Sequence, residues 1–405
     1  MRILVINQYF HPDLAATAQL LTELCEDLAE HHDVTAVVGR PSYDPLVPVE
    51  KVRGLVHQES HGKVRVMRTW STAFPRRSMA GRLSNYVTYL TSSMAGAIGA
   101  APPDVVLTMT DPPVVAAAAM AASRLRGVPF VYVCQDVFPE VGVVLGRLSN
   151  RAVVRSLGAL NRSLRRHAAA VVAIGRDMEQ RLVELGTPRA QIRVIPNWAD
   201  GSQIRPSEGR TAFRSEQGWD DRFVVMQSGN VGLSQSLGTF VDAADLLRNR
   251  SDALFVVIGE GAAKSALERR VRRERLTNVV FLPYQEKRRL SGSLGAADLH
   301  YVGLRRGLAG YIVPSKVYGI MAAGRPFVAA TENHAEPAII AREHGCGLVA
   351  VPDDAAALAD TIVRAREEPL EEMGRRGRVA FERLYDRPVA TGAYQRLLEE
   401  VAATT

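Results

Sequence analysis

The sequence has few cysteines, no long hydrophobic run and, over one stretch, no acidic side chain. Its 405 residues include three cysteines, Cys25, Cys134 and Cys346, too few and too scattered for a disulfide framework or a thiolate metal site. The longest apolar stretch, Pro112 to Ala122, is far shorter than the roughly 20 residues that span a bilayer. The apolar residues 1–7 are too few for a signal-peptide core and indicate a first buried strand. We therefore expect a cytoplasmic protein, soluble or peripheral at the inner face of the plasma membrane.

Basic residues are in modest excess, with 50 Lys and Arg against 43 Asp and Glu. The excess is local, because residues 60–103 contain no Asp or Glu but hold Lys63, Arg65, Arg68, Arg76, Arg77 and Arg82. A solvated basic surface is one explanation, and an anionic partner is the other. Within this stretch, positions 79, 83, 86, 87 and 90 share one helical face. That face either packs on the core or lies on an anionic membrane surface.

Strand-like segments alternate with helical patterns along most of the chain, which predicts an α/β fold with doubly wound parallel sheets. Polar residues do not alternate within the strands, as expected when both faces of a sheet are covered. The predicted strands are 3–7, 34–39, 64–68, 105–109, 130–134 and 170–174, then 223–227, 253–258, 279–282, 299–302, 326–330 and 348–351.

The chain divides into two halves at a polar segment, 197–210, rich in Gly, Pro and Ser. We expect domains of residues 1–200 and 201–385, and a C-terminal helix, 386–405, that returns to the first domain. Ligands of open α/β sheets bind beyond the carboxyl ends of the strands. The site is therefore predicted to lie in a cleft between two facing Rossmann-like domains.

The segment 307–326 is the most informative. A glycine-containing loop leads into Pro314, which suits the first turn of a helix, so Ser315 and Lys316 fall at its N-terminus. Free backbone N–H groups and a lysine at this position bind phosphate well. A diphosphate site and an ordinary helix start with a solvated lysine both fit the pattern.

Several motifs, taken in order, resemble the retaining GT-B glycosyltransferases of family 4 (GT4, group 1). They are Gln8–Asp13 with Thr17-Ala18, Asn197–Asp200, Ser228–Gly232, Pro314–Pro326, Glu336 and Gly345–Val349. The likeness spans nearly the whole chain and is strongest to bacterial enzymes that build surface polysaccharides, including fucosaminyltransferase-like enzymes.

The resemblance implies that the first domain binds an acceptor and the second a nucleotide-diphosphate sugar, with UDP as the expected nucleotide. The sugar passes with retention to a hydroxyl of a lipid-linked or polysaccharide-precursor glycan. No catalytic metal and no cofactor besides the donor are expected. The main chemical task is to stabilise charge on the departing diphosphate.

The chain departs from the family pattern at four donor positions. The paired glutamates of the family fall at Tyr311 and Gly319, and its basic pair falls at Asn230 and Gln235. All four residues are neutral, so the diphosphate charge must be met elsewhere. Lys316 is the predicted replacement, with Arg305, Arg306 and the backbone amides of residues 310–312; an exposed basic loop is the alternative for the two arginines.

Site residues follow from the matched motifs. Catalytic roles are predicted for Asp136, Lys316 and Glu336, although Asp136 equally suits a turn and Glu336 a helix N-terminus. The predicted donor-binding residues are Gly229, Asn230, Tyr284, Gln285, Arg305, Arg306, Gly310, Tyr311 and Ser315. Tyr284 either stacks on the base or lines the cleft wall. His11, Asp13 and Gln135 are the predicted acceptor-side residues.

Other functions stay open at this point. A natural-product glycosyltransferase shares every donor motif, and a GT-B sugar-nucleotide hydrolase or epimerase needs no acceptor. A nucleic-acid-binding protein is disfavoured because no RNP-like, helix-turn-helix or zinc signature is present. A Rossmann oxidoreductase is disfavoured because Gly259-Glu260-Gly261 is too short and too late for a dinucleotide fingerprint.

Overall fold

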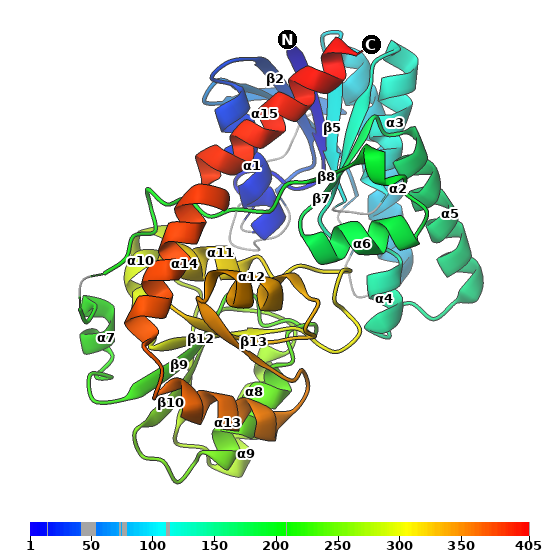
Figure 1. The fold of residues 1–405 in the computed structure, drawn as a ribbon. Coiled ribbons are helices and arrows are strands. Elements are labelled where there is room, and N and C mark those ends of the chain that lie inside the picture. Colours follow the sequence, from blue (N-terminus) through cyan, green and yellow to red (C-terminus); the bar gives the residue numbers. More distant parts are fainter. Residues whose placement is uncertain are drawn as a thin grey trace. The chain divides into compact units, whose positions relative to one another are not determined.

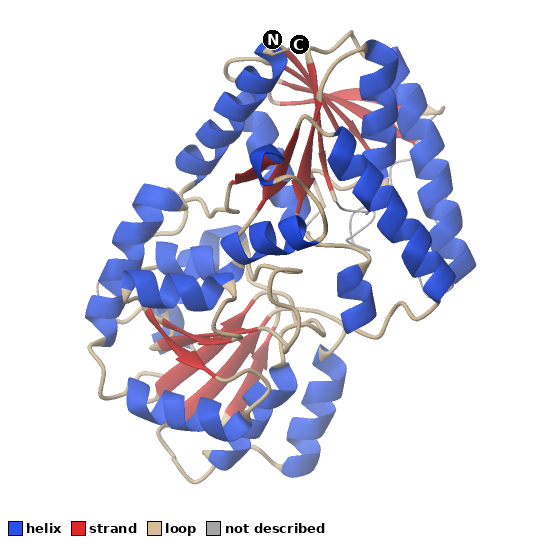
Figure 2. Cartoon of the chain, turned by 45° about the vertical axis from the view of Figure 1, so that its right-hand side comes forward, coloured by secondary structure: helices blue, strands red, loops and turns tan. Residues whose placement is uncertain are grey.

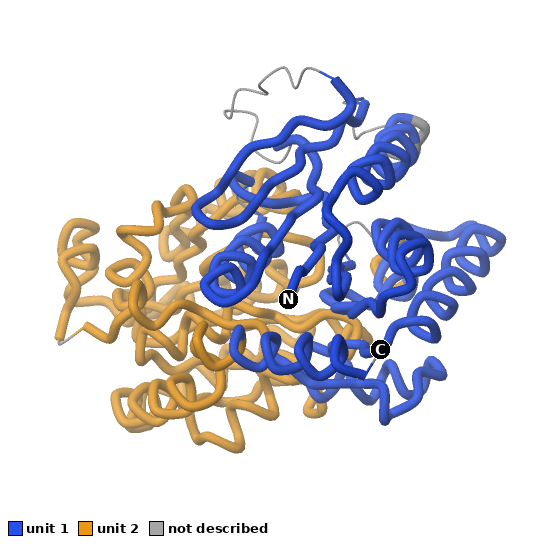
Figure 3. Tube along the Cα trace, turned by 90° about the horizontal axis from the view of Figure 1, so that it is seen from above, with its two compact units in different colours: residues 1–143, 148–196, 391–405 blue, residues 144–147, 197–390 orange. Residues whose placement is uncertain are grey.

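The computed structural model describes residues 1–13, 15–41, 54–72, 74, 79–110, 114–207 and 209–404, without the side chains of residues 79, 80, 82 and 83. Arg76 and Arg77, and the side chain of Arg82, lie outside the described residues. The chain forms two compact units (Figure 3). Unit 1 comprises Met1–Val143, Leu148–Pro196 and Thr391–Thr405, and unit 2 comprises Val144–Arg147 and Asn197–Ala390.

Unit 1 is built on a sheet of eight described strands in the order β3-β4-β2-β1-β5-β6-β7-β8. Neighbours are parallel except for the antiparallel pair β3–β4. The strands are β1 (Arg2–Asn7), β2 (Asp33–Val38), β3 (Val56–His61), β4 (Val64–Thr69), β5 (Val105–Met109), β6 (Phe130–Cys134), β7 (Ala170–Ala173) and β8 (Ile192–Val194). The two strands that the sequence did not predict are at the edges: β3 is largely polar and β8 has three residues.

Helices cover both faces of this sheet (Figures 1 and 2). They are α1 (Ala16–Leu28), α2 (Met79–Gly99), α3 (Val115–Arg126), α4 (Glu140–Val144), α5 (Arg151–His167), α6 (Arg176–Glu184) and α15 (Arg387–Ala403), with a 3-10 turn at Arg189–Gln191. Near the end of α15, Glu399 pairs with His32 at 3.1 Å and Glu400 with Arg193 at 3.2 Å, within unit 1. In the described part of the chain, no helix has the length and apolar character needed to cross a membrane.

The core does not cover the apolar face of α2 at every described position. Val87 is exposed, whereas Tyr89 is fully buried. Ser92 and Ser93 are also buried, and their hydroxyls donate to backbone carbonyls. The core-facing side of α2 is therefore rotated away from position 87, because small hydroxyl-bearing residues satisfy their own polar groups and pack closely.

Unit 2 contains a fully parallel sheet of six strands in the order β11-β10-β9-β12-β13-β14. They are β9 (Phe223–Ser228), β10 (Ala253–Ile258), β11 (Val279–Leu282), β12 (Leu299–Gly303), β13 (Phe327–Ala330) and β14 (Gly347–Ala350). The helices are α7 (Ala212–Glu216), α8 (Leu237–Leu246), α9 (Lys264–Glu274), α10 (Lys287–Gly295), α11 (Lys316–Ala322), α12 (Glu336–His344), α13 (Ala355–Ala365) and α14 (Leu370–Leu384).

Successive residues of these strands enter cores on opposite faces of the sheet. Val225 and Phe255 belong to one core, and Val224 and Val256 belong to another. This is the period-2 geometry of a strand covered on both sides. Both units therefore have the α/β Rossmann-like architecture that the sequence predicted.

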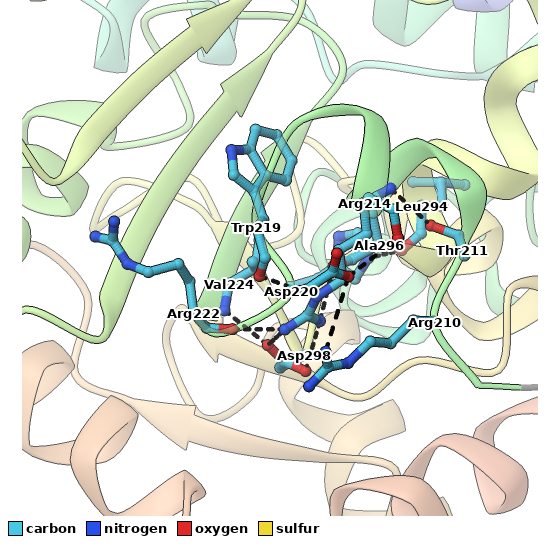
Figure 4. A network of polar contacts seen from close by, with 12 residues as sticks. Arg210, Thr211, Arg214, Trp219, Asp220, Arg222, Val224, Leu294, Ala296 and Asp298 are labelled. Carbon is cyan, nitrogen blue, oxygen red and sulfur yellow. Dashed lines mark hydrogen bonds and ion pairs between the residues drawn. The ribbon is translucent and has the colours of Figure 1, made fainter.

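A buried ion pair fastens α7 to the sheet of unit 2 (Figure 4). The guanidinium of Arg214 donates to both carboxylate oxygens of Asp298, at 2.8 and 3.0 Å. It also donates to the carbonyl oxygens of Trp219, Ala296 and Arg222. Every side of this buried cation therefore meets an acceptor, as a buried charge requires.

Candidate functional site

Hydrogen bonds to a backbone carbonyl and to a carboxylate connect the loops at the carboxyl edge of the unit 2 sheet. The N–H of Arg305 donates to the carbonyl of Ser234 at 2.8 Å, and the N–H of Arg306 donates to Asp353 Oδ2 at 2.9 Å. The hydroxyl of Ser236 donates to the other oxygen of Asp353. Asp353, which the sequence reasoning missed, thus joins the loops that follow β9, β12 and β14.

Lys316 lies at this edge with its ammonium directed to the end of β9. Nζ donates to Oε1 of Gln227, a fully buried residue, and Gln227 Nε2 donates to the carbonyl oxygens of Gly229 and Asn230, each at 3.4 Å. Burial lowers the pKa of Lys316 to about 7. Gln227 therefore links the lysine to the loop after β9, and it was also missed, although a glutamine within the apolar strand FVVMQS is a visible signal.

Two glycines hold a second loop against the loop after β9. A Cβ at Gly259, where φ is +139°, would lie 2.0 Å from the carbonyl oxygen of Gly229. A Cβ at Gly261, where φ is +158°, would lie 2.4 Å from the carbonyl oxygen of Val231. Only glycine permits this approach. The segment that was too short for a dinucleotide fingerprint therefore supports the donor-side loop instead.

The entry to α11 corrects one expectation. The helix begins at Lys316, directly after Ser315, as predicted. However, the N–H groups of Tyr311 and Ile312 both donate to the carbonyl oxygen of Leu308, at 3.0 and 3.3 Å. In this conformation these two amides are not free to bind a diphosphate, which leaves the lysine as the main charged group there.

The remaining donor-side predictions fall on neighbouring loops of unit 2. Glu336 begins α12 and is 2% exposed. The N–H of Gly307 donates to Glu332 Oε2 at 3.0 Å, so the loop after β13 holds the loop of the two arginines. Tyr284 is 46% exposed after β11, and the side-chain amide of Gln285 donates to a backbone carbonyl in the same loop, at 2.8 Å.

In unit 1, the loop after β6 carries Gln135 and Asp136. Their backbone N–H groups donate to the hydroxyl oxygen of Thr110, at 2.9 and 3.2 Å. Gln135 is buried and Asp136 is exposed. Thr110, which follows β5, thus fixes the loop so that the Asp136 carboxylate remains at the surface.

His11 and Asp13 follow β1 at the same edge of the unit 1 sheet. The ring of His11 stacks on that of His61, with centroids 4.4 Å apart, and His61 Nε2 contacts Glu26 Oε1 at 2.9 Å. Arg68 donates to the carbonyl oxygen of His11 at 2.6 Å. Desolvation, then the nearby His61 and Arg68, lowers the pKa of His11. Asp13 is buried.

The predicted residues therefore form two groups, one at the carboxyl edge of each sheet. The described residues contain no group of three or more His, Cys, Asp or Glu side chains placed to hold a metal ion. All three cysteines are buried and free, and burial raises the pKa of Cys134 and of Cys346 to about 12.

The sequence matches two family models, one in each half of the chain. Residues 16–198 match the model described as "Glycosyl transferase 4-like domain". Residues 222–368 match "Glycosyl transferases group 1".

Named relatives and solved structures agree with these matches. WbjE of Pseudomonas aeruginosa, named as a glycosyltransferase, is 32% identical over 277 residues, covering 67% of this chain and 68% of WbjE. WcaI of Escherichia coli K12, named as a glycosyl transferase of colanic acid biosynthesis, is 26% identical, covering 83% of this chain and 84% of WcaI. The structure of Alr3699/HepE from Anabaena, solved with UDP and glucose, superimposes with a TM-score of 0.73 at 17% identity, covering 98% of this chain and 99% of HepE.

Proposed function

Since the chain belongs to the group 1 glycosyltransferases with the GT-B fold, we propose that it transfers a sugar from a UDP-sugar to a hydroxyl of a surface-polysaccharide precursor. The names of WbjE and WcaI support the reaction class, and that of WcaI a polysaccharide product. The HepE complex with UDP and glucose supports the nucleotide. The fold and the carboxyl-edge loops of unit 2 supply a place for such a donor.

The observation that carries this proposal is the ammonium of Lys316. Its only hydrogen-bond partner among the described residues is the neutral amide of Gln227. A half-buried cation without an anion is stabilised when a diphosphate binds beside it, because charge-assisted hydrogen bonds replace lost hydration. Arg305 and Arg306 lie exposed on the adjacent loop and add to the positive potential.

The reaction requires charge stabilisation on the leaving diphosphate rather than a strong base. Lys316 acts on that group, and Glu336 contacts hydroxyls of the transferred sugar. Tyr284 stacks on the base. In unit 1, the exposed carboxylate of Asp136 orients the acceptor hydroxyl, with His11, Asp13 and Gln135 around it. Transfer proceeds with retention and without a catalytic metal.

The acceptor is a lipid-linked glycan precursor at the cytoplasmic face of the membrane. This part of the proposal follows from the polysaccharide branch to which the relatives' names point. A natural-product glycosyltransferase uses a soluble acceptor instead, and a hydrolase or epimerase turns over the donor at full rate without one.

A donor screen tests the proposed function directly. Thermal unfolding is measured with UDP-, GDP-, dTDP- and CMP-sugars, each with and without EDTA, and with uridine as the control that lacks a diphosphate. We expect UDP-sugars to raise the unfolding temperature more than the others, because binding to the folded state alone stabilises it. Equal shifts with uridine and UDP, or no shift with any diphosphate, contradict the proposal. Loss of the UDP shift in EDTA contradicts metal independence alone.

A further inference from the structure

Two residues at the carboxyl edge of the unit 2 sheet have a backbone conformation that most residues avoid. Among the described residues other than glycine, three have a positive φ: Ser236 at +46°, Arg275 at +53° and Asp353 at +58°. This conformation is strained because the Cβ atom crowds the following carbonyl oxygen. Arg275 ends α9, where such a conformation is common. Ser236 and Asp353 instead lie in the loops before α8 and α13, and their strain needs another explanation.

The hydroxyl of Ser236 does not have the role that a serine before a helix usually has. Ser236 directly precedes α8, but its side chain accepts no hydrogen bond from the first turn of that helix. By contrast, Asp354 precedes α13 with an extended backbone, and its carboxylate accepts from the N–H of Ala357 at 2.9 Å, which is the usual capping arrangement. Ser236 donates its hydroxyl to Oδ1 of Asp353. The two strained residues are therefore bonded to each other.

The carboxylate of Asp353 also holds the loop after β12. Three successive N–H groups of that loop donate to three other loops: Arg305 to the carbonyl oxygen of Ser234 at 2.8 Å, Arg306 to Asp353 Oδ2 at 2.9 Å, and Gly307 to Glu332 Oε2 at 3.0 Å. The guanidinium of Arg306 donates to the carbonyl oxygen of Pro352 at 3.2 Å. Both the backbone and the side chain of Arg306 are thus bound to the loop of Asp353.

The loop after β9 lies equally close to the end of β12. The hydroxyl of the fully buried Tyr301 donates to the carbonyl oxygens of Gln235 and Ser236, at 3.2 and 3.1 Å. A Cβ at Gly303 would lie 2.4 Å from the carbonyl oxygen of Gln235, so only glycine allows this approach. The loops after β9 and β12 are therefore held against each other at several points, and Asp353 connects the loop after β14 to both.

We propose that Ser236 and Asp353 are positioning residues, and that their strained pair holds residues 304–307 in the conformation that binds the diphosphate of the donor. This inference rests on the proposed function. Strained backbone persists where the surrounding structure enforces it, and it is concentrated at ligand-binding sites. The loop that the pair holds carries Arg305, whose side chain is exposed and has no hydrogen bond or ion pair among the described residues. A cation on a loop that is ordered in advance binds an anion at a smaller entropic cost.

The alternative is that the pair only connects α8 to α13, which pack against each other (Figure 1). Four variants of the full chain separate the two roles. Asp353→Gly relieves the strain and removes both hydrogen bonds of the carboxylate. Asp353→Asn keeps both, because asparagine tolerates a positive φ, and its amide can accept from the N–H of Arg306 and donate to the oxygen of Ser236. Arg275→Gly relieves the same kind of strain at the end of α9, and Asp354→Ala removes the neighbouring carboxylate.

Calorimetric titration measures UDP affinity, and urea unfolding measures stability. We expect Asp353→Gly to bind UDP about 10-fold more weakly, because the loop must then be ordered on binding. Its unfolding midpoint stays close to the wild-type value, because the relieved strain offsets the lost hydrogen bonds. Asp353→Asn restores UDP affinity to within about twofold of the wild-type chain. Arg275→Gly raises the midpoint and Asp354→Ala lowers it, and both controls keep the wild-type affinity.

Hydrogen–deuterium exchange without any nucleotide tests the loop itself. In Asp353→Gly the amide of Arg306 loses its acceptor, so we expect residues 304–307 to exchange at least about 10-fold faster than in the wild-type chain. Asp354→Ala keeps that acceptor, and exchange of the same residues stays at the wild-type rate.

Three results overturn the positioning role when the wild-type chain binds UDP. They are an unchanged affinity in Asp353→Gly, an affinity in Asp353→Asn as low as in Asp353→Gly, and an unchanged exchange rate of residues 304–307 in Asp353→Gly. A lower midpoint in Asp353→Gly with unchanged affinity assigns the pair to the packing of α8 and α13 instead. A wild-type chain that does not bind UDP contradicts the proposed function, and the role of the pair in donor binding fails with it, whatever the exchange rates show about the loop.

Discussion

Two cations of unit 2, the buried Arg214 and the half-buried Lys316, have opposite surroundings. Arg214 is 7% exposed and has a bidentate carboxylate partner in Asp298 together with three carbonyl oxygens. Among the residues that the structure describes, the ammonium of Lys316 has the amide oxygen of Gln227 as its only hydrogen-bond partner. The first cation is fully compensated inside the fold, whereas the second is not.

This difference separates a structural charge from a functional one. A compensated charge gains nothing from a ligand, because a further anion would have to displace existing hydrogen bonds. A charge without such partners is stabilised when the donor binds, because the diphosphate supplies the missing anion. Burial lowers the pKa of Lys316 to about 7, and no carboxylate of a described residue offsets that shift. This combination makes the residue a site candidate.

The largest expected effect comes from Arg214→Leu. Removing the cation leaves the Asp298 carboxylate with the N–H of Val224 as its remaining donor among the described residues, and takes the Arg214 donor from three carbonyl oxygens. We therefore expect the free energy of unfolding to fall by about 3–5 kcal/mol. Urea unfolding measures this loss. Arg248→Leu is the control, because its exposed pair with Asp245 contributes less than about 1 kcal/mol. Equal losses in the two variants would refute the structural assignment of Arg214.

The second prediction concerns Lys316→Met. We expect UDP to bind about 10–100-fold more weakly, since a charge-assisted hydrogen bond contributes about 1.5–3 kcal/mol. Stability is unchanged or higher, because the variant removes a half-buried charge without orphaning an anion. Calorimetric titration and urea unfolding measure the two quantities. Lys264→Met, which removes a lysine paired with Glu260, is the control. If Lys316→Met lowered the free energy of unfolding as much as Arg214→Leu does, the proposed difference between the two cations would be wrong.

The pH dependence of the unfolding free energy gives a further test of the difference between Lys316 and Arg214. Because the pKa of Lys316 is lowered from 10.5 to about 7 in the folded state, the unfolded chain binds more protons between these values. The contribution of this residue to the unfolding free energy therefore rises as the pH increases from 7 to 10.5. We expect the wild-type chain to gain stability relative to Lys316→Met over this range. Parallel pH profiles of the two proteins argue against the assignment.

The affinity for UDP responds to pH in the opposite direction. A protonated lysine attracts the diphosphate, so affinity falls as the pH rises above about 7 in the wild-type chain. The Lys316→Met variant shows a weaker dependence in calorimetric titrations at about pH 6.5 and about pH 9. A wild-type affinity that rises with pH contradicts the role of the ammonium.

The smallest effect is expected from Gln227→Glu, which gives Lys316 a carboxylate partner of the kind that Arg214 has. The new charge raises the pKa of the lysine and neutralises it toward the donor, so UDP affinity falls about 3–10-fold and its pH dependence moves to higher pH. Gln227→Met removes the hydrogen bond without adding charge and serves as the comparison. An affinity for UDP in Gln227→Glu equal to that of the wild-type chain would show that Gln227 does not position the lysine.

Much of the fold could be predicted because the signals were local. Runs such as 105–109 and 253–258 are apolar on both faces and match their strands to the residue, since burial on both sides of a parallel sheet demands that composition. The edge strands β3 and β8 carried no such signal. The sequence left open which side of α2 faces the core, and buried serines, which pack as small residues, lie on that side.

The sequence by itself determined the two α/β halves, the glycosyltransferase motifs and the position of Lys316 at the start of a helix. Only the tertiary structure decided which group the lysine contacts, because Gln227, at the end of β9, comes from a distant part of the chain. Composition can be read directly from the sequence. The group that pairs with a charged side chain depends on how distant segments of the chain pack together.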